Sequence, residues 1–346
     1  MVEPASMHDE ILVAPASPGP LLVVDELRVE FATDHGWATV VNGVSFSVTP
    51  GETVGLVGES GSGKTVTGLS IMRLIPDPPG RITGGSVTFG GTNLTTLAEP
   101  ALRDIRGNDI AMVFQEPMSS LNPAFTVGQQ ISETVRRHRG CSRREGMNRA
   151  REMLDLVGIP NAAKRVKEYP HEFSGGMRQR VMLAMALCCD PKLVIADEPT
   201  TALDVTIQAQ VLDLLRQMRD ELDMALLLIT HDLGVVAETC DRVVVMYAGE
   251  VVETSGVDEL YAKPRHPYTE GLMRSLPQLG ARHARLASIP GRTPEPWNMP
   301  EGCRFHPRCD YSRDVCRAGP PPLVPIGDGR STRCKRDGEI ELEGVQ

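Results

Sequence analysis

Short apolar runs recur along the chain, and each ends abruptly at a glycine or a polar residue. Runs of this length are typical of strands buried on both faces of a parallel sheet. They lie at residues 54–57, 110–115, 192–197 and 225–230. Other stretches alternate apolar and polar residues, as half-buried strands and hairpins do, and these are Leu21–Thr33, Thr39–Glu52, Ile82–Leu94 and Asp241–Ser255. The pattern predicts an α/β fold with a small antiparallel sheet beside a buried one.

Helical periodicity fills the segments between the apolar runs. Thr65–Ile75 follows the first run directly, and Thr200–Leu215 begins with Asp204 in a tight loop and continues as an amphipathic helix. Between residues 122 and 172 the chain is polar, with apolar residues at helical spacing: Met147, Ala150, Leu154 and Val157. We interpret residues 116–185 as a helical subdomain. Its basic cluster is expected to be a solvated face and consists of Arg136, Arg137, Arg139, Arg143 and Arg144.

The segment Gly58–Thr65 matches the phosphate-loop pattern G-x-x-x-x-G-K-[ST]. It lies between a predicted strand and a predicted helix, and this context separates it from an ordinary glycine-rich turn. Its backbone N–H groups can surround an anion at the positive end of the helix. Lys64 is expected to bridge the outer phosphates, and the Thr65 hydroxyl to bind Mg²⁺. The candidate nucleotide-binding residues are Gly58, Ser60, Gly61, Ser62, Gly63, Lys64 and Thr65.

Polar residues end three of the other predicted strands. Asp197 and Glu198 follow one apolar run, Gln115 follows a second and His231 a third. Ligands of α/β sheets bind outside the carboxyl ends of the strands, so these side chains are expected beside the phosphate loop. Asp197 would hold Mg²⁺ through water, and Glu198 would orient the attacking water. Gln115 can reach the metal or a water, although Gln115 and His231 could each be a turn residue if taken alone.

Two further features could contact a nucleotide. Ser174 can cap a helix whose next residues, Gly175 and Gly176, leave backbone N–H groups bare, which makes a second anion site. Phe31 closes a predicted strand and could stack on a purine, with Trp37 as the less favoured candidate. An ordinary core position is the alternative for Phe31.

Composition narrows the class of protein. The chain has 346 residues, of which 41% are apolar, and is long enough for two domains. No apolar run approaches the roughly 18 residues of a membrane helix. Residues 1–20 are proline-rich and carry acidic residues where a signal peptide is basic, so we expect a disordered tail on a cytoplasmic protein. The formal net charge of −9 argues against a general nucleic-acid binder.

In order and spacing, these motifs resemble the ATP-binding-cassette (ABC) ATPases over residues 21–258. The resemblance rests on the phosphate loop, Gln115, the FSGGM and LVIADEP segments, Asp204 and His231. It implies a cassette-type P-loop nucleotide-binding domain with a RecA-like core, a small antiparallel β subdomain and a helical subdomain. It also implies catalytic roles for Glu198 and His231.

The same resemblance implies a head-to-tail dimer that sandwiches two ATP molecules. One subunit would contribute Lys64 and Glu198 to a site, and the other would contribute the helix end at Ser174. Asp204 would carry contact across the interface. Phe173 and Met177 stand where the commonest signature has leucine and glutamine, which suits an unequal pair of ATPases.

The C-terminal third resembles the ATPase subunits of dipeptide and oligopeptide importers. The resemblance lies in Arg265–Pro277 and Ile289–Cys316, and the FSGGM region looks like one of two paralogous subunits. It implies a paralogous ATPase as heterodimer partner, two membrane permeases and an extracytoplasmic binding protein. The chain would then act at the cytoplasmic face of the membrane, where Gln115–Phe125 and the helical subdomain would receive a permease.

Four cysteines near the end of the chain need a separate explanation. Cys303, Cys309, Cys316 and Cys334 are separated by 5, 6 and 17 residues. A reducing cytoplasm disfavours disulfides, and four thiolates suit zinc or an iron–sulfur cluster. Zinc sites usually pair cysteines more closely, and free thiols remain an alternative. The family resemblance points to a four-iron–four-sulfur cluster in a C-terminal domain, residues 259–335, before a tail, residues 336–346. His266 and His306 are expected at the surface or in turns.

Two other classes of function fit the motifs less well. A soluble cassette ATPase acting on DNA or ribosomes is disfavoured by the acidic charge and the single cassette. A regulatory protein with a degenerate cassette is disfavoured by the intact motif residues. The sequence therefore predicts the ATP-hydrolysing subunit of an importer, with dipeptides, oligopeptides and nickel complexes all open as cargo.

Overall fold

The larger of two sheets is built from the buried apolar runs. In this computed structural model, which describes residues 19–116, 120–200, 205–275 and 289–345, eight strands pair in the order β11-β12-β10-β9-β3-β8-β7-β6. Alternate residues of β8 face two different apolar clusters, so the sheet is covered on both faces. Its parallel strands are β3 (Thr53–Val57), β6 (Ile110–Val113), β7 (Leu193–Asp197), β8 (Ala225–Thr230) and β9 (Arg242–Tyr247).

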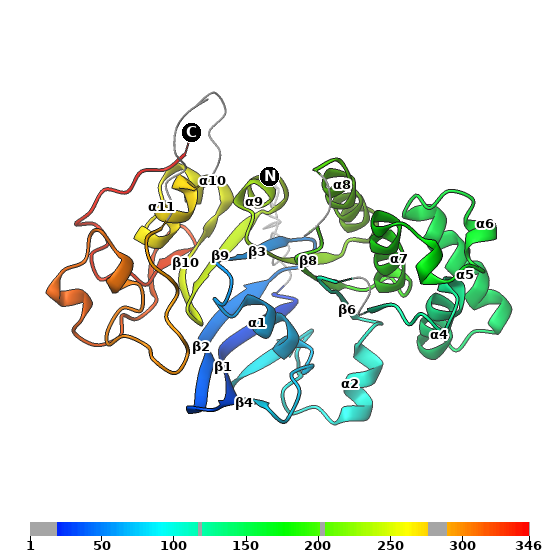
Figure 1. The fold of residues 1–346 in the computed structure, drawn as a ribbon, viewed down its shortest axis with the longest axis horizontal. Helices are drawn as coiled ribbons and strands as arrows, with labels where there is room; N and C mark the ends of the chain where they lie inside the picture. The colour runs from blue at the N-terminus through cyan, green and yellow to red at the C-terminus, as the bar shows by residue number, and fades with distance from the viewer. Residues whose placement is uncertain (1–18, 117–119, 201–204, 276–288, 346) are drawn as a thin grey trace, which may run out of the picture.

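The alternating stretches near the N-terminus form the second, antiparallel sheet. Its order is β2-β1-β4-β5, and its inward residues share an apolar cluster with Leu56 and Ile229 of the larger sheet. Helix α1 (Lys64–Ile71) contacts strands of both sheets, as Figure 1 shows. The strands are β1 (Leu22–Thr33), β2 (Gly36–Val48), β4 (Gly80–Phe89) and β5 (Thr92–Asn93). The predicted α/β fold with a small antiparallel sheet is confirmed.

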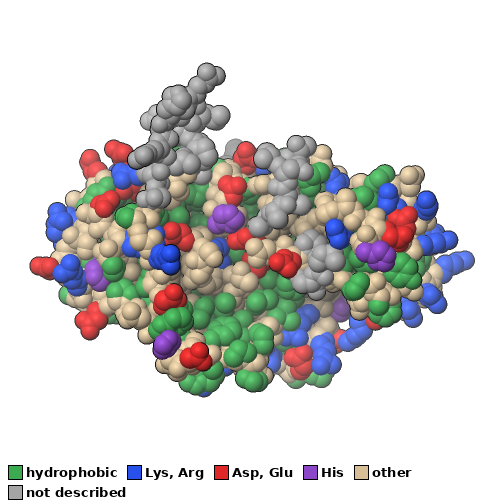
Figure 2. All heavy atoms as spheres, viewed as in Figure 1, with side chains coloured by type: hydrophobic (Ala, Val, Ile, Leu, Met, Phe, Trp, Pro, Cys, Tyr) green, Lys and Arg blue, Asp and Glu red, His purple; other side chains and the backbone are tan. Residues whose placement is uncertain are grey.

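The polar helical segment forms one end of the molecule, beyond β6 (Figure 1). Thr126 and Ser142 close capping boxes at the starts of α4 and α5, which is why these helices begin there. The basic cluster is exposed, and Lys and Arg side chains gather at this end in Figure 2. The helices are α4 (Val127–Arg139), α5 (Arg143–Leu156), α6 (Ala162–Arg165), η1 (Pro170–Glu172) and α7 (Gly175–Leu187).

Two predicted helix boundaries were wrong. Helix α1 ends at Ile71 rather than Ile75, because Arg73 adopts a positive φ of 48° and prolines follow from Pro76. Helix α8 runs from Val205 to Leu222, beyond the predicted end at Leu215. The remaining helices of the cassette are α2 (Glu99–Ile105) and α9 (Leu233–Thr239). Asp204 and the N-terminal segment up to residue 18 lie outside the described residues.

The C-terminal region is joined to the larger sheet. Strand β10 (Glu250–Gly256) pairs with β9 on one side and with the short strand β12 (Arg330–Thr332) on the other, and β11 (Val324–Gly327) follows. An irregular segment was expected here, but the free edge of β10 offers N–H and C=O groups that a late strand can pair with. Helices α10 (Val257–Ala262) and α11 (Pro267–Arg274) and the 3₁₀ turns η2 (His306–Arg308) and η3 (Asp314–Cys316) complete this region (Figure 1).

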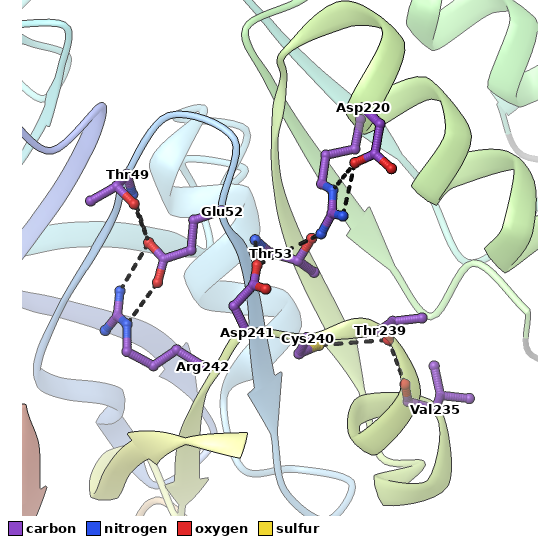
Figure 3. Close-up of polar contacts among 10 residues, drawn as sticks. Thr49, Glu52, Thr53, Asp220, Val235, Thr239, Cys240, Asp241 and Arg242 are labelled. Carbon is purple, nitrogen blue, oxygen red and sulfur yellow. Dashed lines mark hydrogen bonds and ion pairs between the residues drawn. The ribbon is translucent and has the colours of Figure 1, made fainter. Parts of the chain in front are cut away.

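Polar contacts secure the end of β3 that lies away from the phosphate loop (Figure 3). The backbone N–H of Thr53 donates to the Asp241 carboxylate at 2.7 Å, and Arg219 donates to the Thr53 hydroxyl at 3.1 Å. Arg242 pairs with Glu52 at 2.8 Å. Burial disfavours the Glu52 charge, but the hydrogen bonds from Arg242 and Thr49 and the positive charge of Arg242 together outweigh burial and lower the pKa of Glu52. These contacts fix the strand that leads into the loop.

His266 corrects an expectation of the sequence. It was expected at the surface or in a turn, but it is 1% exposed, and its ring accepts the Tyr268 N–H at the start of α11. Burial lowers the pKa of His266 to about 3, so the ring stays neutral and acts as a helix cap.

None of the helices in the described part of the chain has the length and hydropathy that a membrane crossing requires.

Candidate active site

The phosphate loop joins β3 to α1 and adopts a backbone that its glycines make possible. Gly58, Gly61 and Gly63 all have positive φ, of 153°, 79° and 98°. A Cβ on Gly58 would overlap the Met246 carbonyl oxygen, so this position admits only glycine. The Ser62 hydroxyl is buried without a hydrogen-bond partner. An unsatisfied buried hydroxyl inside the loop fits a bound polar group such as a phosphate.

Lys64 lies inside the site rather than in solvent. It is 5% exposed, and its ammonium group donates to the carbonyl oxygens of Gly58 at 2.7 Å and Glu59 at 3.0 Å. Burial lowers the pKa of Lys64, while the negative charges of Glu198, Asp197 and Glu59 oppose that shift. Lys64 therefore lies beside three acidic groups, and the phosphates of a bound nucleotide would interact with the same ammonium group.

Thr65 and Asp197 converge although they lie on different elements. The Thr65 hydroxyl, in the first turn of α1, donates to the Asp197 carboxylate at the end of β7 over 3.1 Å. Asp197 is 3% exposed, and burial raises its pKa, although the bond from Thr65 opposes the shift. A hydroxyl and a carboxylate oxygen at one point are the hard ligands that Mg²⁺ takes together with phosphate oxygens.

Side chains that follow three neighbouring strands come together at Glu198. Its carboxylate accepts a hydrogen bond from Gln115 Nε2 at 3.0 Å and lies 3.2 Å from His231 Nδ1. Gln115 follows β6, Glu198 follows β7 and His231 follows β8. The backbone of Glu198 has a positive φ of 44°, and its N–H donates to the Ile229 carbonyl. Two of the predicted residues, Gln115 and His231, thus flank the carboxylate of the third at the carboxyl edge of the sheet.

The FSGGM segment lies elsewhere in the same chain. Ser174 caps α7 by accepting the Met177 N–H at 3.4 Å, and Ser174 and Gly175 are exposed. Helix α7 packs against α4, α5 and β6, and Figure 1 places it apart from α1. The chain therefore does not bring Ser174, Gly175 and Gly176 to its own phosphate loop.

The two aromatic candidates differ in their surroundings. Phe31 is half-buried in the apolar cluster of the antiparallel sheet, where its ring lies beside Gly80. Trp37 is 50% exposed, and the Arg81 guanidinium lies 3.6 Å from the centre of its ring. The contacts of Phe31 agree with the alternative that it is an ordinary core residue. Stacking of either aromatic on a purine remains a prediction.

The four late cysteines are brought to one pocket. Cys303, Cys309, Cys316 and Cys334 all line it. Within the described residues, however, no group of three or more His, Cys, Asp or Glu lies close enough to hold a metal ion. The expected metal centre is therefore not formed as a ligand set around a single ion. Neither the four-iron–four-sulfur cluster nor the zinc alternative gains support from the described residues.

Sequence comparison identifies the family. The family model of ABC transporters matches residues 41–201, and that of the oligopeptide/dipeptide transporter C-terminal region matches residues 252–316. A protein of Brucella abortus (strain 2308) with the provisional name peptide import ATP-binding protein is 54% identical over 315 residues, 91% of this chain and 94% of that one. The chain belongs to the ABC ATPases of the oligopeptide/dipeptide transporter family. A second protein of that strain, with the same provisional name, is 53% identical over 332 residues, 93% of this ABC ATPase and 98% of the relative.

Solved structures confirm the cassette fold of this ABC ATPase. A dimeric ATP-binding cassette in a post-hydrolysis state, bound to ADP and phosphate, superposes with a TM-score of 0.61 at 26% identity. That match covers 68% of this chain and 98% of the other. The cbiO1 subunit of an ABC transporter complex from Clostridium perfringens gives a TM-score of 0.59 at 26% identity, over 70% and 91% of the two chains. The predicted fold, family and ATPase activity are confirmed.

Proposed function

We propose that this ABC ATPase hydrolyses ATP to drive the import of dipeptides or oligopeptides through partner permeases. The observation that carries the proposal is the peptide-transporter C-terminal region joined to an intact phosphate loop and sheet-edge site in one chain. The names of the curated relatives support the same cargo class. No comparison supports a role on DNA or ribosomes.

The proposed mechanism is an in-line attack of water on the terminal phosphate of ATP. The phosphate-loop N–H groups and Lys64 would neutralise phosphate charge, and Thr65 with Asp197 would hold Mg²⁺, which supplies further positive charge to the phosphates when bound. Glu198 orients and polarises the water. Gln115 donates from Nε2 to the Glu198 carboxylate at 3.0 Å, so its amide oxygen would be the atom that binds Mg²⁺ or the water. His231 lies 3.2 Å from the same carboxylate and would contact the terminal phosphate.

A second ATPase subunit would complete each site. Ser174 and Gly175 are exposed at the start of α7 and lie apart from the phosphate loop of their own chain (Figure 1). A helix N-terminus with bare N–H groups favours an anion, so we propose that it meets the ATP of a paralogous partner in a head-to-tail heterodimer. Two permeases and an extracytoplasmic binding protein complete the importer, with this chain at the cytoplasmic face of the membrane.

The cargo is tested by reconstituting the full complex in vesicles with its binding protein. We expect a dipeptide or oligopeptide to raise ATP hydrolysis several-fold and to accumulate inside in an ATP-dependent way. A complex that carries Glu198→Gln should take up no peptide, because transport through the permeases requires ATP hydrolysis by this subunit. Stimulation by a nickel complex alone, or by duplex DNA with no response to peptides, would contradict the proposed cargo.

We further propose that the four cysteines hold a four-iron–four-sulfur cluster. All four side chains line one pocket, as the ligands of a single cluster must. Burial raises the pKa of Cys309 to about 11 and of Cys334 to about 12, so both thiols stay protonated until a metal displaces the protons. Such a cluster would supply a cross-link between chain segments with little regular structure.

Anaerobic purification followed by metal and sulfide analysis tests the cluster. We expect about four iron and four sulfide per chain, with loss of most of both in Cys303→Ser. Cys141→Ser is the matched control, because Cys141 is half-buried and lies outside the pocket. One zinc without sulfide, or no metal at all, would show that the pocket holds no cluster and would leave the ATPase assignment standing.

A further inference from the structure

The phosphate loop is held from outside by an arginine of the C-terminal region. Arg308 donates from Nη1 to Glu59 Oε2 at 2.7 Å and from Nη2 to Glu59 Oε1 at 3.0 Å. Glu59 is the second residue of the loop and lies 249 positions earlier in the chain. The Arg308 side chain is 5% exposed and that of Glu59 is 32% exposed. A two-bond pair of this kind fixes the orientation of both groups as well as their distance.

The backbone of Glu59 is held as firmly as its side chain. Its N–H donates to the Tyr268 hydroxyl at 2.7 Å, and Tyr268 is fully buried in α11. The Tyr268 ring packs against Tyr247, at 4.6 Å between ring centres, and against Phe305 at 5.3 Å. The C-terminal region therefore forms hydrogen bonds with both the main chain and the carboxylate of Glu59.

Other contacts hold the Arg308 side chain in place beside its pair with Glu59. Its Nε donates to the Pro290 carbonyl at 2.8 Å, and Nη2 also reaches the Ile289 carbonyl at 3.3 Å. Nη1 lies 3.4 Å from the Tyr247 hydroxyl. With its nitrogens bound to main chain and aromatic groups, the guanidinium has little freedom to follow a moving loop. Lysine could supply the charge but not this planar fork.

Glu59 also contacts the phosphate-binding lysine, Lys64, through its carbonyl oxygen. The Glu59 carbonyl oxygen accepts from Lys64 Nζ at 3.0 Å, beside the bond to Gly58. We propose that Arg308 and Tyr268 are positioning residues of the ATP site, through which the C-terminal region holds the phosphate loop in its binding conformation. The inference rests on the phosphate loop being where ATP binds. A preorganised loop spares the ordering that binding would otherwise cost, so the effect should appear in ATP affinity.

ATP affinity of Arg308 and Glu59 variants tests this proposal in the full-length protein. Arg308→Gln and Glu59→Gln are each expected to weaken binding of a non-hydrolysable ATP analogue about 10-fold, with a much smaller change in kcat at saturating ATP. The double variant should bind no more weakly than either single variant, because both remove the same contact. Arg308→Lys should fall between wild type and Arg308→Gln.

Arg265→Gln is the matched control. It breaks another two-bond pair of the C-terminal region, to Asp337 at 2.6 and 2.7 Å, whose side chains do not contact the phosphate loop. It should lower the unfolding temperature and leave ATP affinity within about 2-fold of wild type. Thermal unfolding of every variant separates loss of folding from loss of affinity, and Glu59→Gln, at the partly exposed end of the pair, carries the test if Arg308→Gln does not fold.

Three results would overturn the positioning role. They are wild-type affinity in folded Arg308→Gln and Glu59→Gln, additive losses in the double variant, and an equal loss of affinity in Arg265→Gln. Failure of the ATP site itself would look different, because Lys64→Ala would then bind ATP as wild type does.

Discussion

Glu198→Gln is expected to bind ATP with wild-type affinity and to hydrolyse it about 10² to 10⁴ times more slowly. Glutamine has the shape of glutamate, so it keeps polar contacts to Gln115 and His231, which lie 3.0 and 3.2 Å from the carboxylate. It cannot take up the developing charge of the attacking water, so the chemical step loses its base. Equilibrium ATP binding and steady-state hydrolysis, measured on one preparation, separate the two effects.

The matched control for this variant is Glu238→Gln. Glu238 lies on α9, its side chain is 75% exposed, and its ion pair to Arg216 spans 3.6 Å. An exposed pair of this kind contributes little, so turnover should not change. With the paralogous subunit present, Glu198→Gln should also accumulate an ATP-bound heterodimer on size-exclusion chromatography. Wild-type turnover in Glu198→Gln would refute the assignment of this carboxylate as the base.

Lys64→Ala is expected to weaken ATP binding about 100-fold and to abolish hydrolysis with it. Lys64 is almost fully buried, and its ammonium group already lies within the loop at 2.7 Å from the Gly58 carbonyl. Alanine removes the only positive charge that the loop itself supplies and leaves Asp197 and Glu198 uncompensated beside the phosphates. Isothermal titration with ATP and Mg²⁺ measures the loss.

Lys192→Ala controls for the loss of a lysine in general. Lys192 immediately precedes β7, its side chain is 67% exposed, and it pairs with Asp109 at 2.9 Å. Its removal should leave ATP affinity unchanged. Equal affinity of Lys64→Ala and wild type would mean that the phosphate loop is not where ATP binds.

The substitutions at Lys64, Glu198 and Arg308 separate three steps at one site. Lys64→Ala should remove binding, Glu198→Gln should remove hydrolysis while binding persists, and Arg308→Gln should weaken binding while turnover at saturating ATP persists. Because Arg308 belongs to the region that resembles peptide transporters, its effect would tie that region to the ATP site of the cassette.

Residues that interact with near neighbours could be predicted from the sequence. The phosphate loop depends on glycines at fixed spacing, and the structure gives Gly58 and Gly63 the positive φ that the pattern requires. The predicted cap at Ser174 is formed within three residues, by the Met177 N–H. The apolar runs predicted the buried strands because burial on both faces leaves no polar position in the run. These features need only local chemistry, so one sequence is sufficient.

Contacts between distant residues were decided by the tertiary structure. The sequence placed Gln115, Glu198 and His231 at strand ends, but only the order of β6, β7 and β8 brings residues 83 and 33 positions apart to one carboxylate. Motif spacing says which residues end strands, whereas strand order depends on packing over the whole sheet.

Neither the hold of Arg308 on Glu59 nor the burial of His266 has a signal in the sequence. Arg308 lies in a segment of prolines and cysteines without periodicity, and its partner is 249 residues away. Both depend on the aromatic packing of Tyr268 and Phe305, which positions α11 and η2 against the loop. The sequence alone therefore determined the chemistry of the ATP site, through residue types at short spacing. The long-range packing that holds the site in place was decided only by the tertiary structure.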